Sequence, residues 1–275
     1  SGFLVNKDKG LILTNAHVTG RSKSKVRVAF KNYGFSPVKQ VYIDPRIDIA
    51  IVKIDPKLIP KEAKEAKLKC DGKVPSGTSV AAFGHPKGLS FSASRGIVSK
   101  YRFLSGRDVI QTDTAINKGN SGGPLIDMNT GFVIGINKSS FSKSTGLSFA
   151  VPAKNVCIIL DLFNENKNPS PITLPIRFAE DREAEDYLKV GSFYHKGKNI
   201  EIGSSLIAVD DTPIKTPSEL DFFLRGKTGE AILTFRNNGS NTKYNITINP
   251  EEKILDRKYL YLSGAIISRD PRTMY

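Results

Sequence analysis

The chain has 275 residues, 39% of them hydrophobic, and a formal net charge of +14. This length favours about two domains with substantial cores, and no apolar run is long enough to span a membrane. No signal peptide is present at Ser1, and because the chain opens directly on strand-like residues, we expect an upstream segment to be missing, together with any localisation signal. Two cysteines are too few for a disulfide framework, and the sequence does not decide whether they pair; we take Cys70 and Cys157 as free thiols, the second of them buried on a helix.

The positive charge lies mainly in the first part of the chain. Residues 1–165 carry 25 basic and 12 acidic side chains, whereas the remainder carries 16 and 15. The segment Arg21–Lys39 contains basic residues and no acidic one, which would suit an anionic surface such as lipid headgroups. A solvated strand face is the simpler interpretation, because no aromatic-rich nucleic-acid signature accompanies it. We therefore expect no nucleic-acid partner and leave an anionic surface open.

Residues 1–165 are predicted to form a succession of short strands. Gly, Pro and Asp at their joints are typical of sandwiches or barrels. One helix, Pro152–Leu162, closes this region, with proline in its first turn. The strands are expected at Phe3–Val5, Leu11–Thr14, Lys25–Phe30, Val38–Ile43, Ile49–Ile54, Ser79–Phe83, Gly96–Tyr101, Val109–Thr112, Phe132–Asn137 and Leu147–Val151.

The first candidate for chemistry in chain order is His17, which directly follows a predicted strand. A general base needs a pKa near the working pH, and imidazole has one without adjustment. A polar residue that simply closes a strand is the alternative interpretation. Of the other two histidines, we expect His85, in a turn before proline, to be structural, and His195, among Lys and Gly, to face solvent.

Asp48 is the candidate partner of that base. It precedes Ile-Ala-Ile-Val (49–52), which reads as a buried strand, and a carboxylate at the mouth of a buried strand is costly unless it has a partner. His17 would supply the partner, and the acid would orient the imidazole and stabilise its protonated form. We interpret Asp44 as a turn residue before proline and give Asp113, eight residues before Ser121, a structural role.

The motif Gly-Asn-Ser-Gly-Gly-Pro-Leu (119–125) holds the candidate nucleophile, Ser121. A serine hydroxyl needs a neighbouring base, and it needs donors aimed at the oxyanion that forms when it attacks a carbonyl. Glycine at 119 allows backbone angles that let its N–H and that of Ser121 point into one concavity. We therefore assign the oxyanion hole to Gly119, Asn120 and Ser121. An ordinary turn is the alternative, since these residue types all favour turns.

Three motifs in this order, Asn-Ala-His-Val (15–18), Asp-Ile-Ala-Ile-Val-Lys (48–53) and the motif at 119–125, resemble trypsin-like serine proteases, and more narrowly the HtrA (Deg) branch. Gln-Thr-Asp-Thr-Ala-Ile-Asn (111–117) and Leu-Ser-Phe-Ala-Val-Pro (147–152) look like that branch's surroundings. The resemblance implies a mainly β fold of two six-stranded barrels with the triad His17, Asp48 and Ser121 in the cleft between them. We expect the opening strand of the first barrel to be absent before Ser1.

The resemblance also carries functional expectations. It implies no cofactor and no metal, a homotrimer or larger assembly, and a location in the periplasm or in an organelle of bacterial origin. Asn120 replaces the aspartate that zymogen-activated relatives carry before the serine, so we expect no activation by N-terminal cleavage. By the same resemblance, the loops 101–108 and 139–145 correspond to loops that gate activity in HtrA-like enzymes.

Substrate preference is predicted from three residues. Ala115, six positions before Ser121, corresponds to the floor of the primary specificity pocket in trypsin-like relatives, and a neutral floor cannot pair with Lys or Arg. The facing strand offers an apolar wall at Ile136, followed by Asn137. We therefore expect small or medium aliphatic residues before the scissile bond.

A second domain is expected after residue 165. Residues 166–171 have linker composition, and residues 172–250 resemble the α+β PDZ domain that follows the protease in HtrA relatives. Its helix should be capped by Thr216 or Ser218. PDZ domains hold peptide C-termini, which makes such termini an expected partner. Residues 251–275 are predicted to be a tail or the start of a second PDZ-like unit.

The leading functional hypothesis is an ATP-independent serine endopeptidase that cleaves unfolded or damaged proteins through an acyl-enzyme on Ser121. The alternative is a catalytically latent chaperone-like or peptide-binding scaffold of the same fold. An anion-binding adaptor that uses the basic first domain is a third hypothesis, from another functional class.

Overall fold

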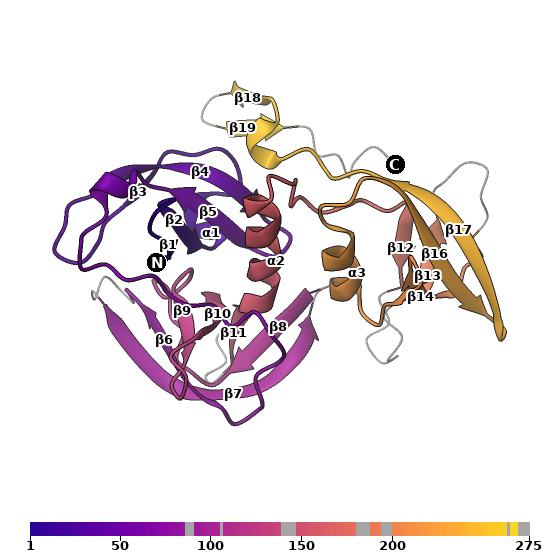
Figure 1. Ribbon diagram of the computed structural model, residues 1–275, viewed down its shortest axis with the longest axis horizontal. Coiled ribbons are helices and arrows are strands. Elements are labelled where there is room, and N and C mark those ends of the chain that lie inside the picture. The colour runs from indigo at the N-terminus through magenta and orange to yellow at the C-terminus, as the bar shows by residue number, and fades with distance from the viewer. Residues whose placement is uncertain are drawn as a thin grey trace. The chain divides into compact units, whose positions relative to one another are not determined.

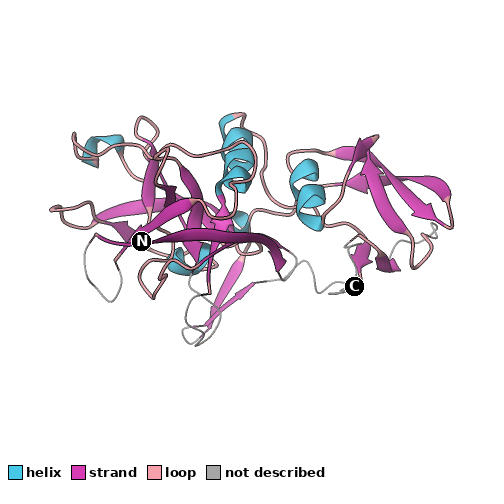
Figure 2. Cartoon of the chain, turned by 90° about the horizontal axis from the view of Figure 1, so that it is seen from below, coloured by secondary structure: helices cyan, strands magenta, loops and turns pink. Residues whose placement is uncertain are grey.

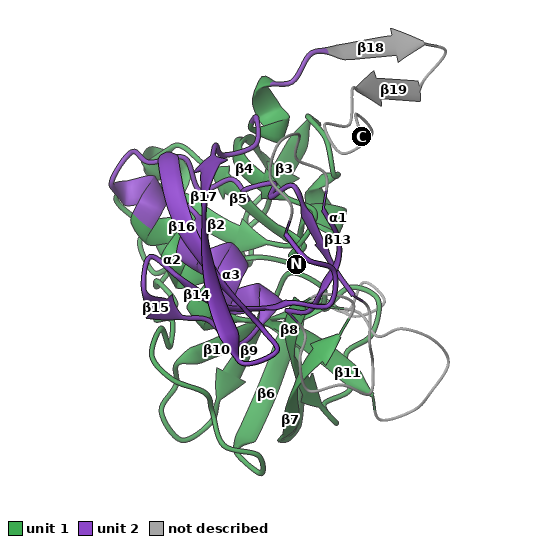
Figure 3. Cartoon of the chain, turned by 90° about the vertical axis from the view of Figure 1, so that its right-hand side faces the viewer, with its two compact units in different colours: residues 1–161, 253–256 green, residues 162–252, 257–275 purple. Residues whose placement is uncertain are grey.

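A computed structural model describes residues 1–85, 91–104, 107–138, 147–179, 188–193, 200–262 and 265–268. Strands dominate and helices are few, as Figure 2 shows. The chain divides into two compact units, residues 1–161 with 253–256 and residues 162–252 with 257–275 (Figure 3). The predicted mainly β class is therefore confirmed.

The first sheet of unit 1 has five antiparallel strands in the order β1-β2-β5-β4-β3 (Figure 1). The central β5 is buried over its first four residues, because Ile, Ala, Ile and Val leave it no polar face. Its core is built by Leu4, Ile12, Val52, Ile54 and Ile59. Among the described residues this sheet has five strands, one fewer than the six-stranded barrel that the family resemblance implied. The strands are β1 (Phe3–Asn6), β2 (Leu11–Thr14), β3 (Val26–Val28), β4 (Ser36–Asp44) and β5 (Ile49–Lys53).

The second sheet of unit 1 is a closed six-stranded barrel in the order β10-β11-β8-β7-β6-β9, as the family resemblance implied. Its interior is apolar and includes Val98, Ile110, Leu125 and Ile134. One strand, β9, was not predicted, since it starts at the proline of the nucleophile motif. The strands are β6 (Ser79–Gly84), β7 (Ser92–Leu104), β8 (Arg107–Thr112), β9 (Pro124–Asp127), β10 (Val133–Lys138) and β11 (Ser148–Pro152).

Unit 1 also contains short helical elements. The helix α1 (Ala16–Thr19), which the sequence analysis did not predict, carries His17. The 3-10 turn η1 (Pro56–Leu58) lies in the connection between the two sheets. The predicted closing helix is α2 (Ala153–Asn164), one residue later at its start and two at its end. No helix among the described residues is long and apolar enough to cross a membrane.

The prediction of two free thiols is wrong. Cys70, in the connection between the two sheets, and Cys157, buried on α2, form a disulfide with a Cα–Cα distance of 5.7 Å. Composition alone argues against a framework of disulfides, but it does not bear on whether one particular pair meets in space. The tertiary path brings two positions 87 residues apart within bonding distance.

The described residues of unit 2 form an α+β body with a helix and a four-stranded sheet, order β15-β14-β16-β17. Thr216 caps the helix α3 (Pro217–Leu224), as predicted, by accepting the Glu219 N–H at 3.1 Å. The core joins Leu220 and Leu224 of α3 to the sheet at Leu206, Leu233 and Phe235. The strands are β12 (Ile176–Phe178), which pairs with β13 (Val190–Phe193), then β14 (Ser205–Val209), β15 (Thr212–Pro213), β16 (Gly229–Asn237) and β17 (Ser240–Ile248).

The last described segment follows a 3-10 turn, η3 (Ile254–Asp256), and forms a hairpin of β18 (Tyr259–Leu262) and β19 (Ala265–Ser268). The hairpin agrees with the strand-like pattern of the sequence. Whether it belongs to a tail or begins a second PDZ-like unit stays a prediction.

Candidate active site

His17 on α1 and Asp48 in the turn before β5 form a close pair. Asp48 lies in the turn before β5 with a φ of 61°, and its Oδ2 is 2.9 Å from His17 Nδ1. The backbone N–H of His17 donates to Asp48 Oδ1 at 3.0 Å. Asn15 Nδ2 donates to the Asp48 carbonyl oxygen at 2.9 Å. These bonds fix the imidazole ring, because the Asp48 carboxylate binds both the ring and the backbone of His17, and Asn15 also holds the Asp48 backbone in place.

The Asp48 carboxylate is the buried member of the pair. Its side chain is 3% exposed, against 32% for His17. Burial raises the pKa of the Asp48 carboxyl, but the hydrogen bonds and charge of His17 outweigh burial, and the pKa lies below its usual range. Asp48 therefore stays ionised at neutral pH and can stabilise a protonated imidazole.

Lys138, the last residue of β10, is a second cation on the same carboxylate. Its Nζ lies 3.6 Å from Asp48 Oδ2, and its side chain is 21% exposed. The sequence analysis did not single out Lys138, because no local pattern connects the end of β10 to the turn before β5.

The nucleophile motif forms a turn between two attachments to β10. Gly122 N–H donates to the Asn137 carbonyl oxygen at 2.9 Å, and Asn137 N–H donates to Gly123 at 2.8 Å. Ser121 lies between Gly119 and Gly122, which have φ values of 110° and 82°. Such angles favour glycine, which explains why the motif needs it at these two positions.

The nucleophile motif also packs against the approach to His17. A Cβ atom on Gly122 would lie 2.2 Å from Thr14 Oγ1 and 3.1 Å from the Asn15 N atom. The residue after Ser121 is thus in direct contact with the residues just before α1. The structure brings the loop of the predicted nucleophile to the loop of the predicted base.

The predicted oxyanion residues differ in how their amides are used. Asn120 N–H donates to Asn117 at 2.9 Å, so this amide is turned away from a substrate. Among the described residues, the Gly119 amide donates to no acceptor. The Gly119 carbonyl accepts the His85 N–H at 3.2 Å and Ser1 Oγ at 2.7 Å. His85 therefore supports the nucleophile motif through its backbone N–H, in agreement with its predicted structural role.

The two remaining candidate acids have local structural partners. Asp44 Oδ1 accepts the N–H of Arg46 at 2.9 Å, as expected of a turn residue. Asp113 Oδ1 accepts the N–H of Ile97 at 2.6 Å and so ties β7 to the segment before the nucleophile motif. His195, which was predicted to face solvent, lies outside the described residues.

The sequence and the fold of this chain are similar to those of known proteins. The family described as trypsin-like peptidase domain matches residues 1–136. A probable periplasmic serine endoprotease, DegP-like, of Pseudomonas putida is 33% identical over 90% of this chain. The chloroplastic Protease Do-like 1 of Arabidopsis thaliana is 38% identical over 67% of this chain. A solved structure, the HtrA-type protease AlgW with a tripeptide, has a TM-score of 0.73 at 25% identity and covers 91% of this chain and 89% of its own.

The chain belongs to the HtrA family of serine proteases. It spans 55% of the length of the Pseudomonas putida relative and 44% of the Arabidopsis thaliana relative. The similarity therefore bears on the family and the fold of the part that the chain spans.

The predicted specificity residues of this HtrA chain are placed unequally. Ala115 is exposed, and its carbonyl accepts Ser94 Oγ at 2.9 Å. Ile136 is fully buried. The Asn137 side chain is also buried, and its Nδ2 donates to the carbonyls of Phe83 and Pro124. Of the three residues, Ala115 alone is exposed to solvent and could contact a substrate in this conformation. The assignment of the three residues to a specificity pocket stays a prediction.

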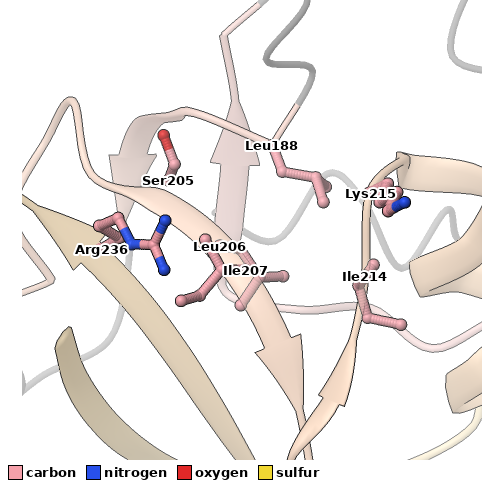
Figure 4. A pocket seen from close by; sticks show the side chains of 7 residues that line it. All are labelled: Leu188, Ser205, Leu206, Ile207, Ile214, Lys215 and Arg236. Atoms are coloured by element: carbon pink, nitrogen blue, oxygen red, sulfur yellow. The ribbon is translucent and has the colours of Figure 1, made fainter.

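The described residues of unit 2 line a hollow of about 420 Å³. Figure 4 shows Lys215 and Arg236 on either side of it, with apolar side chains between them. Its lining is Leu188, Ser205, Leu206, Ile207, Ile214, Lys215 and Arg236. In the described part of the chain, no group of three or more His, Cys, Asp and Glu could hold a metal ion.

Proposed function

We propose that this protein is an ATP-independent serine endopeptidase that cleaves unfolded or misfolded proteins through an acyl-enzyme on Ser121. The observation that carries the proposal is the His17–Asp48 pair, held at 2.9 Å beside the glycine-flanked turn of Ser121. Membership of the HtrA family supports the reaction class.

The proposed mechanism assigns one step to each group. With Nδ1 of His17 bonded to Asp48, Nε2 is the ring nitrogen that takes the proton from Ser121 Oγ as this oxygen attacks the scissile carbonyl. The N–H groups of Gly119 and Ser121 would stabilise the oxyanion. Protonated His17 then gives its proton to the leaving amine. In the second half, His17 takes a proton from water, the hydroxide attacks the acyl carbonyl, and Ser121 recovers its proton.

Labelling with a fluorophosphonate tests the nucleophile. This probe forms a covalent bond with an activated serine, so the wild-type protein should be labelled and Ser121→Ala should not. His17→Ala should abolish both labelling and casein cleavage, whereas Asp48→Asn should retain a small residue of cleavage. Full casein cleavage by Ser121→Ala would overturn the proposal. Absence of labelling in the folded wild type would favour the latent scaffold.

Peptide substrates are supported by related structures. AlgW has been solved with a tripeptide and with a decapeptide. We propose that cleavage follows small or medium aliphatic residues, because the exposed Ala115 carries no charge to pair with Lys or Arg. Mapping of cleavage sites in unfolded casein by mass spectrometry tests this, and enrichment of Lys or Arg would contradict it.

For residues 172–250, we propose a PDZ-like role in binding peptide C-termini at the hollow of unit 2. The apolar floor would take the last side chain, and Lys215 and Arg236 would attract the carboxylate. A fluorescent peptide with a free C-terminus should bind in a polarisation assay, and the same peptide with an amidated end should bind more weakly. Equal binding of the two peptides, or full binding by Lys215→Ala with Arg236→Ala, would rule out this site.

We also propose a compartment and an assembly state for this protein. The relatives include proteins named periplasmic and chloroplastic, and the Cys70–Cys157 disulfide suits an oxidising compartment such as the periplasm. We propose a homotrimer or larger assembly, which light scattering after size exclusion would test. The basic segment Arg21–Lys39 is proposed as an anionic-surface contact, for which retention on anionic vesicles should fall with salt.

A further inference from the structure

The contact that carries a further inference joins Lys138 to the catalytic carboxylate. The Lys138 Nζ atom lies 3.6 Å from Asp48 Oδ2, the same oxygen that lies 2.9 Å from His17 Nδ1. Asp48 is almost fully buried and Lys138 is about four-fifths buried. Charges in such a place interact more strongly than on the surface, because water screens them less.

The position of the ammonium group is set by the strand that carries it. Lys138 pairs with Phe149 of β11 in register, and Asn137 before it is bonded through its backbone to Gly122 and Gly123. The cation is thus attached to the same strand end that holds the nucleophile motif. A Lys side chain anchored in this way can act on the triad without contact with substrate.

The charged groups around Lys138 are few among the described residues. Burial lowers the pKa of the Lys138 ammonium, and the facing Asp48 carboxylate raises it in part. The charges of Arg107 and Arg21 lower the same pKa further, so that it lies below the ordinary value of lysine. On the carboxylate side, the charged neighbours are His17 and Lys138 themselves.

We propose that Lys138 is a positioning residue that shares the Asp48 carboxylate with His17 and so disfavours the protonated imidazole, extending proteolysis to lower pH than the pair alone would allow. The inference rests on the proposed function. The reason is electrostatic: one carboxylate stabilises a single imidazolium fully, whereas a second cation on the same oxygen offsets part of its field and repels the proton on His17.

The test is the dependence of kcat/KM on pH for a chromogenic peptide. Lys138→Met removes the charge and keeps most of the side-chain length. In this variant the midpoint of the acidic limb should shift to higher pH by about 0.5 to 1 unit. The expected shift is small because His17 is partly exposed and water screens the interaction. Lys138→Arg keeps the charge and should leave the limb close to that of the wild type. An unchanged limb in Lys138→Met would overturn the inference.

A matched control is Lys154→Met. Lys154 is also partly buried, at 27% exposure, and its Nζ lies 3.7 Å from Asp108 Oδ2 rather than from Asp48. This variant loses the same charge from the same unit and should not move the acidic limb. A shift as large as that of Lys138→Met would assign the effect to net charge and would overturn the role of the contact.

A substitute variant and an NMR titration test the inference if Lys138→Met is unstable or inactive. If Lys138→Met does not fold by circular dichroism, Lys138→Gln replaces it. In the Ser121→Ala background, the pH midpoint of the His17 Cε1–H NMR signal should rise when Lys138 is replaced by Met, and an unmoved midpoint would overturn the inference without any turnover being measured. Fluorophosphonate labelling of the wild type separately reports whether the proposed function itself holds.

Discussion

Gly122 N–H donates to the carbonyl oxygen of Asn137 at 2.9 Å, and Asn137 N–H donates in return to the carbonyl of Gly123 at 2.8 Å. These two bonds continue the antiparallel pairing of β9 with β10 into the nucleophile motif. The Asn137 side chain adds two further bonds, from Nδ2 to the carbonyls of Phe83 and Pro124. One residue thus ties together the start of β9, the end of β6 and the turn of Ser121.

The first prediction concerns Asn137. Asn137→Ala removes both Nδ2 donors and leaves two carbonyl groups without them in a buried place, so unfolding free energy should fall by about 1–3 kcal/mol. The kcat should fall as well, because the Ser121 turn loses support. Urea denaturation and peptide hydrolysis measure these effects. Wild-type stability and turnover in Asn137→Ala would contradict this role.

The second prediction concerns Gly122. Gly122→Ala places a Cβ 2.2 Å from Thr14 Oγ1 at a φ of 82°, so the loop must shift and fluorophosphonate labelling should be largely lost. Gly131→Ala is the control, because Gly131 also has positive φ, 74°, but a Cβ there meets open space. The control should cost only about 1 kcal/mol of strain and should keep labelling. Equal losses in the two variants would show that backbone strain, and not the contact with Thr14, is responsible.

The third prediction follows from the lowered pKa of Asp48. A carboxyl whose folded-state pKa lies below its unfolded value contributes stability that is present above the unfolded pKa, about 3.9, and is lost as pH falls through the folded pKa. As the pH falls from about 5 to 2, the difference in unfolding free energy between wild type and Asp48→Asn should therefore change in favour of the variant. Chemical denaturation of both proteins between pH 2 and 7 measures it. A difference that does not vary with pH would contradict the depressed pKa.

The fourth prediction concerns the disulfide. A bond between positions 87 residues apart restricts the unfolded chain, and the chain-entropy description puts the gain at about 4.6 kcal/mol. Dithiothreitol should lower the Tm of the wild type, whereas the Cys70→Ser, Cys157→Ser double variant should start at that lower Tm and not respond to the reductant. Two reactive thiols per chain in a native, unreduced sample would show that the bond does not form.

Much of the site could be predicted from short stretches of sequence. The run Ile-Ala-Ile-Val after Asp48 predicts a buried strand with a carboxylate at its mouth, and the glycine at 119 predicts the positive φ angle found there. Thr216 was predicted as a helix cap for the same reason. In each case the determining interactions lie within a few residues, so the local sequence carries them.

Other features were decided only by the tertiary structure. Cys70 meets Cys157, and Lys138 meets Asp48, because the closing of the barrel and the order of the strands bring distant positions together. Ile136 was predicted as a pocket wall and is fully buried, since its exposure depends on what the neighbouring strands place over it. The sequence by itself determined which residues can carry the chemistry. Long-range packing decided which cation shares the Asp48 carboxylate, because a contact between distant strand ends leaves no periodic or local pattern in the chain.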